Sequence, residues 1–184
     1  MGRHKQFDRT EVIEKAMHVF WEKGFASSSL KDIEKATGVF KSGLYSEFKD
    51  KDDLFIQTIH HYKQNHPSRK ILGRDPLGWE NIREFFRLVI LSENQFGDYL
   101  ACIVPELGLL PKRVRSILEE SMAACGNDFV KNLKAAGLKK DIQLALDFIT
   151  TFHYGMTVKV KLEPGEKIEK EIDSYIKLLQ SSLK

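Results

Sequence analysis

The residues best suited to a specific chemistry lie between Ser29 and Phe48, where the sequence predicts two short helices joined by a turn at Gly38. With its apolar anchors set aside, the second helix has an outer face formed by Phe40, Lys41, Ser42, Gly43 and Ser46. Small and polar residues let a helix approach base edges and phosphates in a DNA major groove. The same spacing also fits an ordinary helical hairpin, so both interpretations stay open at this point.

Enzymatic chemistry has no comparable pattern. The sequence lacks the glycine-rich dinucleotide and nucleotide-phosphate motifs, the paired-histidine zinc motif and the serine nucleophile elbow. We therefore expect no enzyme, no catalytic residue, no metal and no cofactor. A helical-bundle enzyme that has no recognisable motif is kept as the alternative of another class.

The elements that position these residues are predicted to be helices throughout. Acidic or serine caps precede the first, second and fourth helices at Asp8, Ser29 and Asp50, and each has an acidic residue three positions later. The later helices are predicted near residues 77–94, 98–108, 111–136, 139–161 and 165–182, after a loop over 67–78. The expectation is an all-α chain of about nine helices.

The composition indicates a folded chain but does not identify its partners. The chain has 184 residues, of which 42% are hydrophobic and 30% charged, and its net charge is +3. That charge permits nucleic acid as a partner without arguing for it. The longest uninterrupted apolar run is far too short to cross a membrane, and the chain does not open with a secretory signal. With two cysteines, the expected location is the cytoplasm.

Several motifs in register resemble the tetracycline-repressor (TetR) family of transcription regulators. They run Phe20-x3-Gly24-Phe25, then Ser28-Ser29-Leu30-x2-Ile33, then Thr37-Gly38-Val39-x4-Leu44-Tyr45-x2-Phe48-x2-Lys51-x2-Leu54. The opening residues Gly2 to Asp8 resemble a branch with a Gly-Arg-x-Arg/Lys-x-Phe-Asp start. The resemblance implies a helix-turn-helix DNA-binding domain over 1–50 and a helical ligand-binding and dimerisation domain over 51–184.

The same resemblance implies roles at DNA. An N-terminal arm, Arg3 and Lys5, would lie against phosphate or a minor groove. Lys41 and Ser42 would face bases. The complete implied set is Arg3, Lys5, Ser28, Ser29, Lys41, Ser42, Gly43, Tyr45, Ser46 and Lys51. Two positions depart from the family: Gly43 replaces a hydroxyl residue, and Glu47 would repel phosphate unless it pairs with Lys49 or Lys51.

The second domain is expected to sense a small apolar or aromatic effector and to release a palindromic operator, as a repressor does. The expected pocket lining is Tyr99, Cys102, Met122, His153 and Tyr154. An alternative is a redox or electrophile sensor that acts through Cys102; a role for Cys125 is left open. The last two long helices would form the homodimer through Phe148, Phe152, Gly155, Ile172, Ile176 and Leu179.

Overall fold

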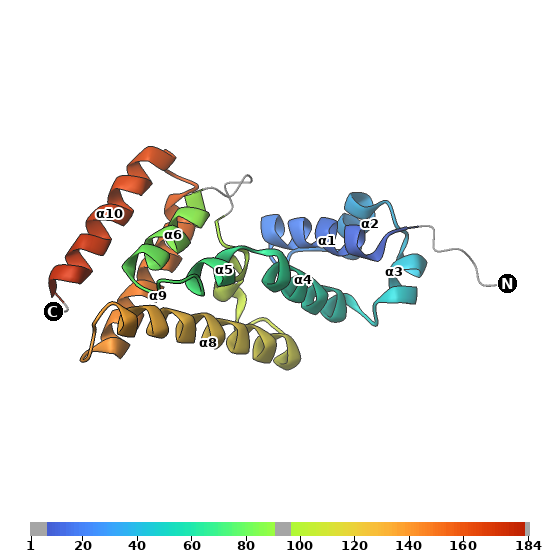
Figure 1. Cartoon of the computed structure of the whole chain (residues 1–184). Coiled ribbons are helices and arrows are strands. Elements are labelled where there is room, and N and C mark those ends of the chain that lie inside the picture. The colour runs from blue at the N-terminus through green and yellow to red at the C-terminus, as the bar shows by residue number, and fades with distance from the viewer. Residues whose placement is uncertain (1–6, 91–96, 183–184) are drawn as a thin grey trace. The chain divides into compact units, whose positions relative to one another are not determined.

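The computed structural model describes residues 7–90 and 97–182, which form ten α-helices and one 3-10 helix with no strand among them (Figure 1). In chain order these are α1 Arg9–Lys23, α2 Leu30–Thr37, α3 Lys41–Glu47, α4 Lys51–Asn65, α5 Ser68–Leu72, α6 Trp79–Ile90, α7 Tyr99–Ile103, η1 Val104–Glu106, α8 Lys112–Ala135, α9 Ile142–Lys159 and α10 Gly165–Ser182. The all-α expectation is confirmed.

Two differences from the predicted helices have local causes. Residues 67–78 contain a short helix, α5, because Pro67 is tolerated at a helix start and its carbonyl accepts from Ile71 N at 3.0 Å. The predicted 98–108 helix splits into α7 and η1. Pro105 has no backbone N–H and cannot continue an α-helical hydrogen-bond series.

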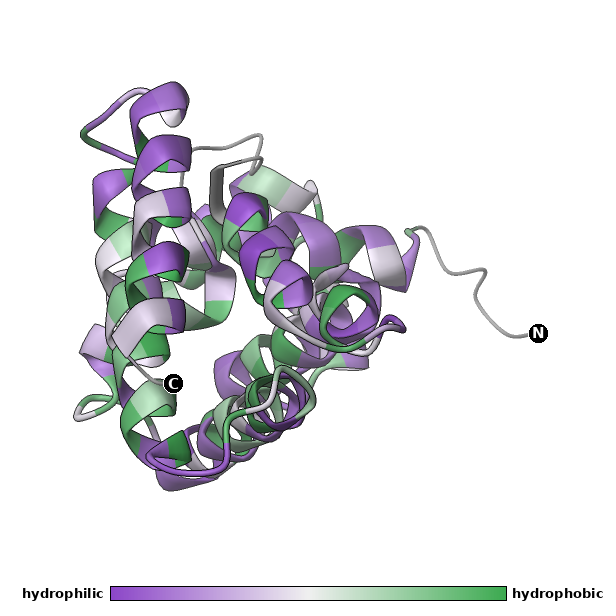
Figure 2. Ribbon diagram, turned by 60° about the vertical axis from the view of Figure 1, so that its left-hand side comes forward, coloured by the Kyte–Doolittle hydropathy of each residue, from purple (hydrophilic) through white to green (hydrophobic). Residues whose placement is uncertain are grey.

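The helices group into two compact units. Unit 1 takes the chain up to Asn65 together with Ile103–Leu118, and unit 2 takes His66–Cys102 together with Glu119–Lys184. Helix α4 therefore belongs with the first three helices in unit 1, where it packs against α1. Hydrophobic and hydrophilic residues interleave along the helices of both units, as amphipathic helices require (Figure 2).

The core of unit 1 is built on aromatic rings. Phe20, Phe25 and Phe55 are buried, and the Phe55 ring centroid lies 4.8 Å from Phe20 and 4.7 Å from Phe25. These rings come from α1, the loop after it and α4. Their packing holds α1 and α4 together and so supports α2 and α3.

The core of unit 2 combines aromatic rings with buried amides. Phe85 and Phe129 meet edge to face at 4.8 Å, and α6 packs against α10. Asn81 and Asn132 are also buried. The Asn132 amide oxygen accepts from Gly78 N at 2.9 Å and from Asn81 Nδ2 at 3.1 Å, while its amide nitrogen donates to Leu72 O at 2.8 Å and Asp128 O at 2.9 Å. This network fastens the 72–81 loop to α8.

Candidate nucleic-acid interface and the cavities of unit 2

Local capping fixes the two helices of the hairpin. Ser29 and Asp32 form the predicted capping box: Asp32 N donates to Ser29 Oγ at 3.2 Å, and Ser29 N donates to Asp32 Oδ2 at 2.9 Å. Gly38 ends α2 with φ 73°, a left-handed conformation that favours glycine, and donates to Glu34 O at 2.9 Å. The predicted helix-turn-helix is therefore present in unit 1.

Helix α3 begins without a side-chain cap of its own. Its N-cap is Phe40, and the carboxylate of Glu34 on α2 accepts from Lys41 N instead. Leu44 and Phe48 are buried and anchor the helix to unit 1. The exposed face consists of Phe40, Lys41, Ser42, Tyr45 and Ser46.

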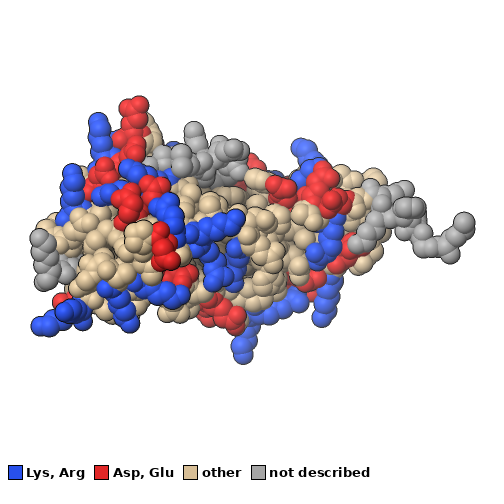
Figure 3. Space-filling model, in the orientation of Figure 1, with Lys and Arg blue, Asp and Glu red and all other residues tan. Residues whose placement is uncertain are grey.

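Two side chains on this face interact with α3 itself. The Lys41 ammonium lies 5.6 Å from the Tyr45 ring centroid, and the Ser46 hydroxyl donates to Gly43 O at 2.7 Å. The face therefore offers a cation, hydroxyl groups and two aromatic rings. Basic and acidic side chains intermingle over the face of the protein shown in Figure 3, so any attraction to DNA depends on where single charges stand.

One expected DNA contact, Ser28, is corrected by the structure, and Gly43 has a packing role in α3. Ser28 is only 2% exposed, and its hydroxyl donates to Gly24 O at 2.5 Å, so it stabilises the loop before α2 and does not face solvent. Gly43 is half-buried, and a Cβ there would lie 2.8 Å from Val39 Cγ1. The missing side chain is a packing requirement on the inner side of α3 and does not open a gap in its outer face.

Lys51 and Ser29 have structural partners of their own. Lys51 Nζ donates to Phe25 O at 2.6 Å and lies 4.4 Å from the Phe25 ring centroid; partial burial lowers the pKa of Lys51. Lys51 thus ties the start of α4 to the loop after α1. Ser29 is exposed, although its hydroxyl is engaged in the capping box. Arg3 and Lys5 lie outside the described residues.

Glu47 is neutralised by a residue that the sequence did not suggest. Arg9 Nε lies 3.9 Å from Glu47 Oε2, and the Arg9 guanidinium carbon lies 5.0 Å from the Phe48 ring centroid. The expected pairing was with Lys49 or Lys51. Lys51 instead donates to Phe25 O, and Lys49 N donates to Asp53 Oδ2 at 2.9 Å as part of the α4 cap.

Residues 103–118 make further contacts within unit 1 that the sequence did not reveal. Glu106 Oε2 accepts from Ala26 N at 2.8 Å, and Arg113 pairs with Asp50 and, at 3.3 Å, with Asp52. A Cβ on Gly24 would lie 1.7 Å from Glu106 Oε1, so the glycine makes room for the carboxylate. These partners are about 60 to 80 positions apart, beyond any local pattern.

Unit 2 holds a small cavity of about 10 Å³ beside the buried His153 and the half-buried His66. It is lined by His66, Phe85, Leu88, Gly97, Asp98 and His153. His153 Nε2 has no hydrogen-bond partner among the described residues, and burial lowers the pKa of both His66 and His153. Of the expected pocket residues, His153 borders this cavity, Tyr99 is fully buried, and Cys102, Met122 and Tyr154 are half-buried.

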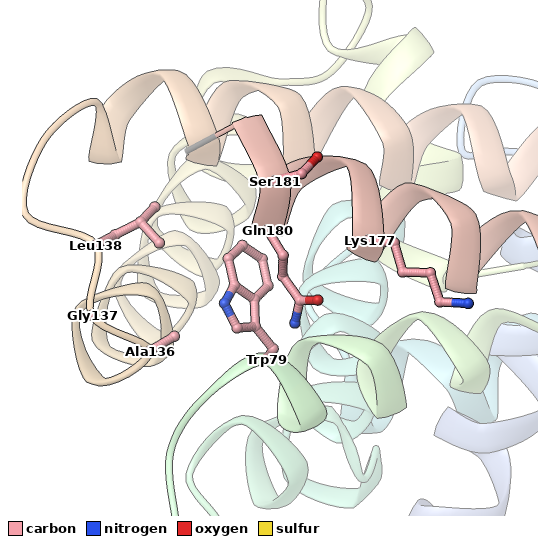
Figure 4. A pocket seen from close by; sticks show the side chains of 7 residues that line it. All are labelled: Trp79, Ala136, Gly137, Leu138, Lys177, Gln180 and Ser181. Carbon is pink, nitrogen blue, oxygen red and sulfur yellow. The ribbon is translucent and has the colours of Figure 1, made fainter. Parts of the chain in front are cut away.

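A larger open hollow lies where α10, α6 and the α8–α9 turn meet (Figure 4). Its volume is about 490 Å³, and it is lined by Trp79, Ala136, Gly137, Leu138, Lys177, Gln180 and Ser181. The Trp79 indole and the Gln180 amide point toward one another across it. These residues come from three separate parts of the chain, so no local sequence pattern indicates them.

The dimer residues expected on α10 are corrected. Ile172, Ile176 and Leu179 are buried in the core of unit 2 because this face of α10 packs on α6. On α9, Phe152 is half-buried and stacks on Tyr175 with centroids 3.8 Å apart. Five exposed positions of α9 follow a helical repeat, namely Leu144, Phe148, Thr151, Gly155 and Val158, and Gln143 and Asp147 are exposed beside them. Phe148 and Gly155 therefore lie on one exposed face.

The two cysteines differ in environment. Cys102 is half-buried, and burial raises the pKa of Cys125 to about 12, so the Cys125 thiol stays protonated at neutral pH. Within residues 7–90 and 97–182, no cluster of three or more His, Cys, Asp or Glu side chains could hold a metal ion. None of the described helices is long and apolar enough to cross a membrane.

Comparison with known proteins gives this geometry a context. Residues 12–58 match the family of bacterial regulatory proteins described as the tetR family. A stretch of 61 residues is 43% identical to the HTH-type transcriptional repressor ComR of Escherichia coli (strain K12); it covers 33% of this chain and 29% of ComR. The chain thus matches less than a third of the length of that relative.

Solved structures resemble the chain over nearly its whole length. A cysteine mutant of CifR, a TetR family transcriptional regulator complexed with 26-base-pair operator DNA, superposes with a TM-score of 0.83 at 23% identity, covering 96% of this chain and 98% of CifR. FadR from Bacillus subtilis in complex with stearoyl-CoA superposes with a TM-score of 0.69 at 21% identity, covering 96% and 100%. These proteins share the fold, and the family match covers the hairpin. Residues 12–58 thus match the tetR family of bacterial regulatory proteins, and the whole chain shares the fold of the solved TetR regulators.

Proposed function

We propose that the chain is a transcriptional repressor that binds a palindromic DNA operator as a homodimer. The observation that carries this proposal is the outer face of α3, where Lys41, Ser42, Tyr45 and Ser46 are exposed while Leu44 anchors the helix from behind. The second helix of a helix-turn-helix enters the major groove with such a face. The names of ComR, a repressor, and of CifR, complexed with operator DNA, support the same role.

The test is binding to DNA of defined sequence. Wild-type protein should select a palindromic site from a random duplex library. Lys41→Ala should weaken binding to that site, and Tyr45→Phe should weaken it through loss of a phosphate contact. Lys134→Ala, which removes an exposed cation from α8 in unit 2, is the matched control and should bind as the wild type does. A wild type that selects no sequence would overturn the proposal.

The exposed face of α9 supports the homodimer. Leu144 and Phe148 are each 48% exposed and Val158 is 57% exposed, on a stripe that also holds Gly155. A second copy would cover this apolar stripe, and Gly155 would permit close approach of the helices. Phe148→Glu should yield monomers in sedimentation and abolish operator binding, whereas Lys140→Glu, an exposed change in the turn before α9, should do neither.

We also propose that unit 2 binds a small apolar or aromatic effector that releases the operator. The stearoyl-CoA named with FadR supports this proposal. Anilinonaphthalene sulfonate, used as an aromatic probe, should bind reversibly and lower operator affinity, and Cys102→Ser should leave this response intact. Release by hydrogen peroxide from wild type but not from Cys102→Ser would instead make the thiol the sensor.

A further inference from the structure

Phe40 is the most exposed large hydrophobic side chain among the described residues, at 79%. It is the N-cap of α3, immediately before the exposed Lys41 and Ser42. A single exposed apolar residue on a surface needs no explanation. The position of Phe40 does need an explanation, because the N-terminal residues of the second helix of a helix-turn-helix contact base edges.

The structure holds this end of α3 firmly while leaving the ring uncovered. Val39 on one side of Phe40 is 8% exposed, and Leu44 one turn later is 1% exposed. The Glu34 carboxylate accepts from Lys41 N, directly after Phe40. The backbone that carries Phe40 is therefore fixed from both sides, so the ring is presented by a rigid element.

The chemistry of the Phe40 ring limits which groups of a base edge it can recognise. A phenylalanine side chain neither donates nor accepts a conventional hydrogen bond, so it cannot recognise the polar groups of a base edge. The apolar feature of the major groove is the 5-methyl group of thymine, and phenylalanine is among the residues that contact it. Lys41 and Ser42, by contrast, can bond to base acceptors.

We infer that Phe40 is a specificity-determining residue that packs against a thymine methyl group in each operator half-site. This inference rests on the proposed function, because it names the base that the α3 face reads. It predicts that each half-site contains a thymine whose methyl group, and not only its hydrogen-bonding groups, contributes to affinity.

The test removes that methyl group without changing base pairing. After a site has been selected with wild-type protein, each thymine is replaced by deoxyuridine in turn, at symmetric positions of the two half-sites. One replacement should lower affinity roughly fourfold per half-site, the value of about one buried methyl-sized group. Phe40→Ala should bind the thymine and deoxyuridine duplexes equally. Tyr45→Phe, the matched aromatic change on the same face, should keep the thymine preference.

The outcomes separate this inference from the proposed function. Because the ring is exposed, Phe40→Ala should melt as the wild type does, so lost binding would not reflect unfolding. If the wild type selects a site but no deoxyuridine replacement changes its affinity, DNA binding stands and the role of Phe40 is overturned. It is also overturned if Phe40→Ala retains the thymine preference. If no site is selected at all, both proposals fail.

Discussion

The centres of the two units are built differently. In unit 1 the rings of Phe20, Phe25 and Phe55 pack together, and a cation, Lys51, lies against Phe25 with its ammonium donating to a backbone carbonyl. In unit 2 the rings share the interior with a histidine: the Phe85 centroid lies 5.0 Å from that of His153. A titratable side chain inside a core makes packing depend on its protonation, so unit 2 is the more responsive of the two.

The sequence provides a separate probe for each unit. It contains two tryptophans, Trp21 in unit 1 and Trp79 in unit 2. The Trp21 ring packs edge to face on Tyr62 at 5.7 Å, whereas Trp79 lines the open hollow of unit 2. In the Trp79→Phe variant the fluorescence of the remaining Trp21 therefore reports on unit 1 alone. In the Trp21→Phe variant the fluorescence of Trp79 reports on unit 2 alone.

The largest expected effect is the loss of the buried amide network of unit 2. Asn132→Ala removes four hydrogen bonds and leaves Gly78 N and Leu72 O without their side-chain partner. The free energy of unfolding reported by Trp79 should fall by about 3 kcal/mol. Urea denaturation in the Trp21→Phe background measures it. The exposed Lys134→Ala change should leave the midpoint unmoved, and an equally stable Asn132→Ala variant would contradict the role of the network.

The second-largest expected effect is a loss of stability of unit 2 on acidification. Burial lowers the pKa of His153, so below about pH 6.5 the unfolded chain takes up a proton that the folded chain does not. Stability is therefore fully present above that pH and is lost as the pH falls toward the lowered folded pKa. The slope is at most about 1.4 kcal/mol per pH unit for one histidine.

His66 faces the same cavity, with its own pKa lowered by burial, and Asp98 opposes both shifts. We measure the free energy of unfolding by Trp79 fluorescence between pH 7 and about 5. His153→Leu should reduce its slope against pH by an amount that corresponds to at most one bound proton. His60→Gln, an exposed change on α4, serves as the control and should leave it as in the wild type. An unchanged slope in His153→Leu would contradict the proposal that His153 makes unit 2 more sensitive to pH than unit 1.

The smallest effect concerns the loop after α1 in unit 1. Glu106→Ala deprives Ala26 N of its acceptor and should lower the stability reported by Trp21 by about 1 kcal/mol. Glu106→Gln keeps an acceptor oxygen and should recover most of that loss. Glu119→Ala, an exposed change in unit 2, should have no effect on Trp21. If the glutamine variant is as unstable as the alanine variant, the hydrogen bond is not the cause.

Much of unit 1 could be predicted because its signals are local. Asp8 caps α1 and accepts from Thr10 N at 2.6 Å, Asp50 Oδ1 accepts from Asp53 N at 2.8 Å at the start of α4, and Gly38 ends α2, as expected. The roles of Ser28 and Gly43 could not be read in this way. A serine before a helix and a glycine within one are compatible with either an inner or an outer position, and only the packing of Gly24 and Val39 against them decides.

The sequence by itself determined where the capped helices α1, α2 and α4 begin and that residues 29–48 form a helix-turn-helix, since caps and turns act over a few positions. The tertiary structure alone decided which partner each face meets. The apolar stripe of Ile172, Ile176 and Leu179 shows only that one side of α10 is buried; the packing on α6 assigns it to the core of unit 2. The contact between Glu106 and Ala26 has the same cause, because residues 80 positions apart meet only once the chain has folded.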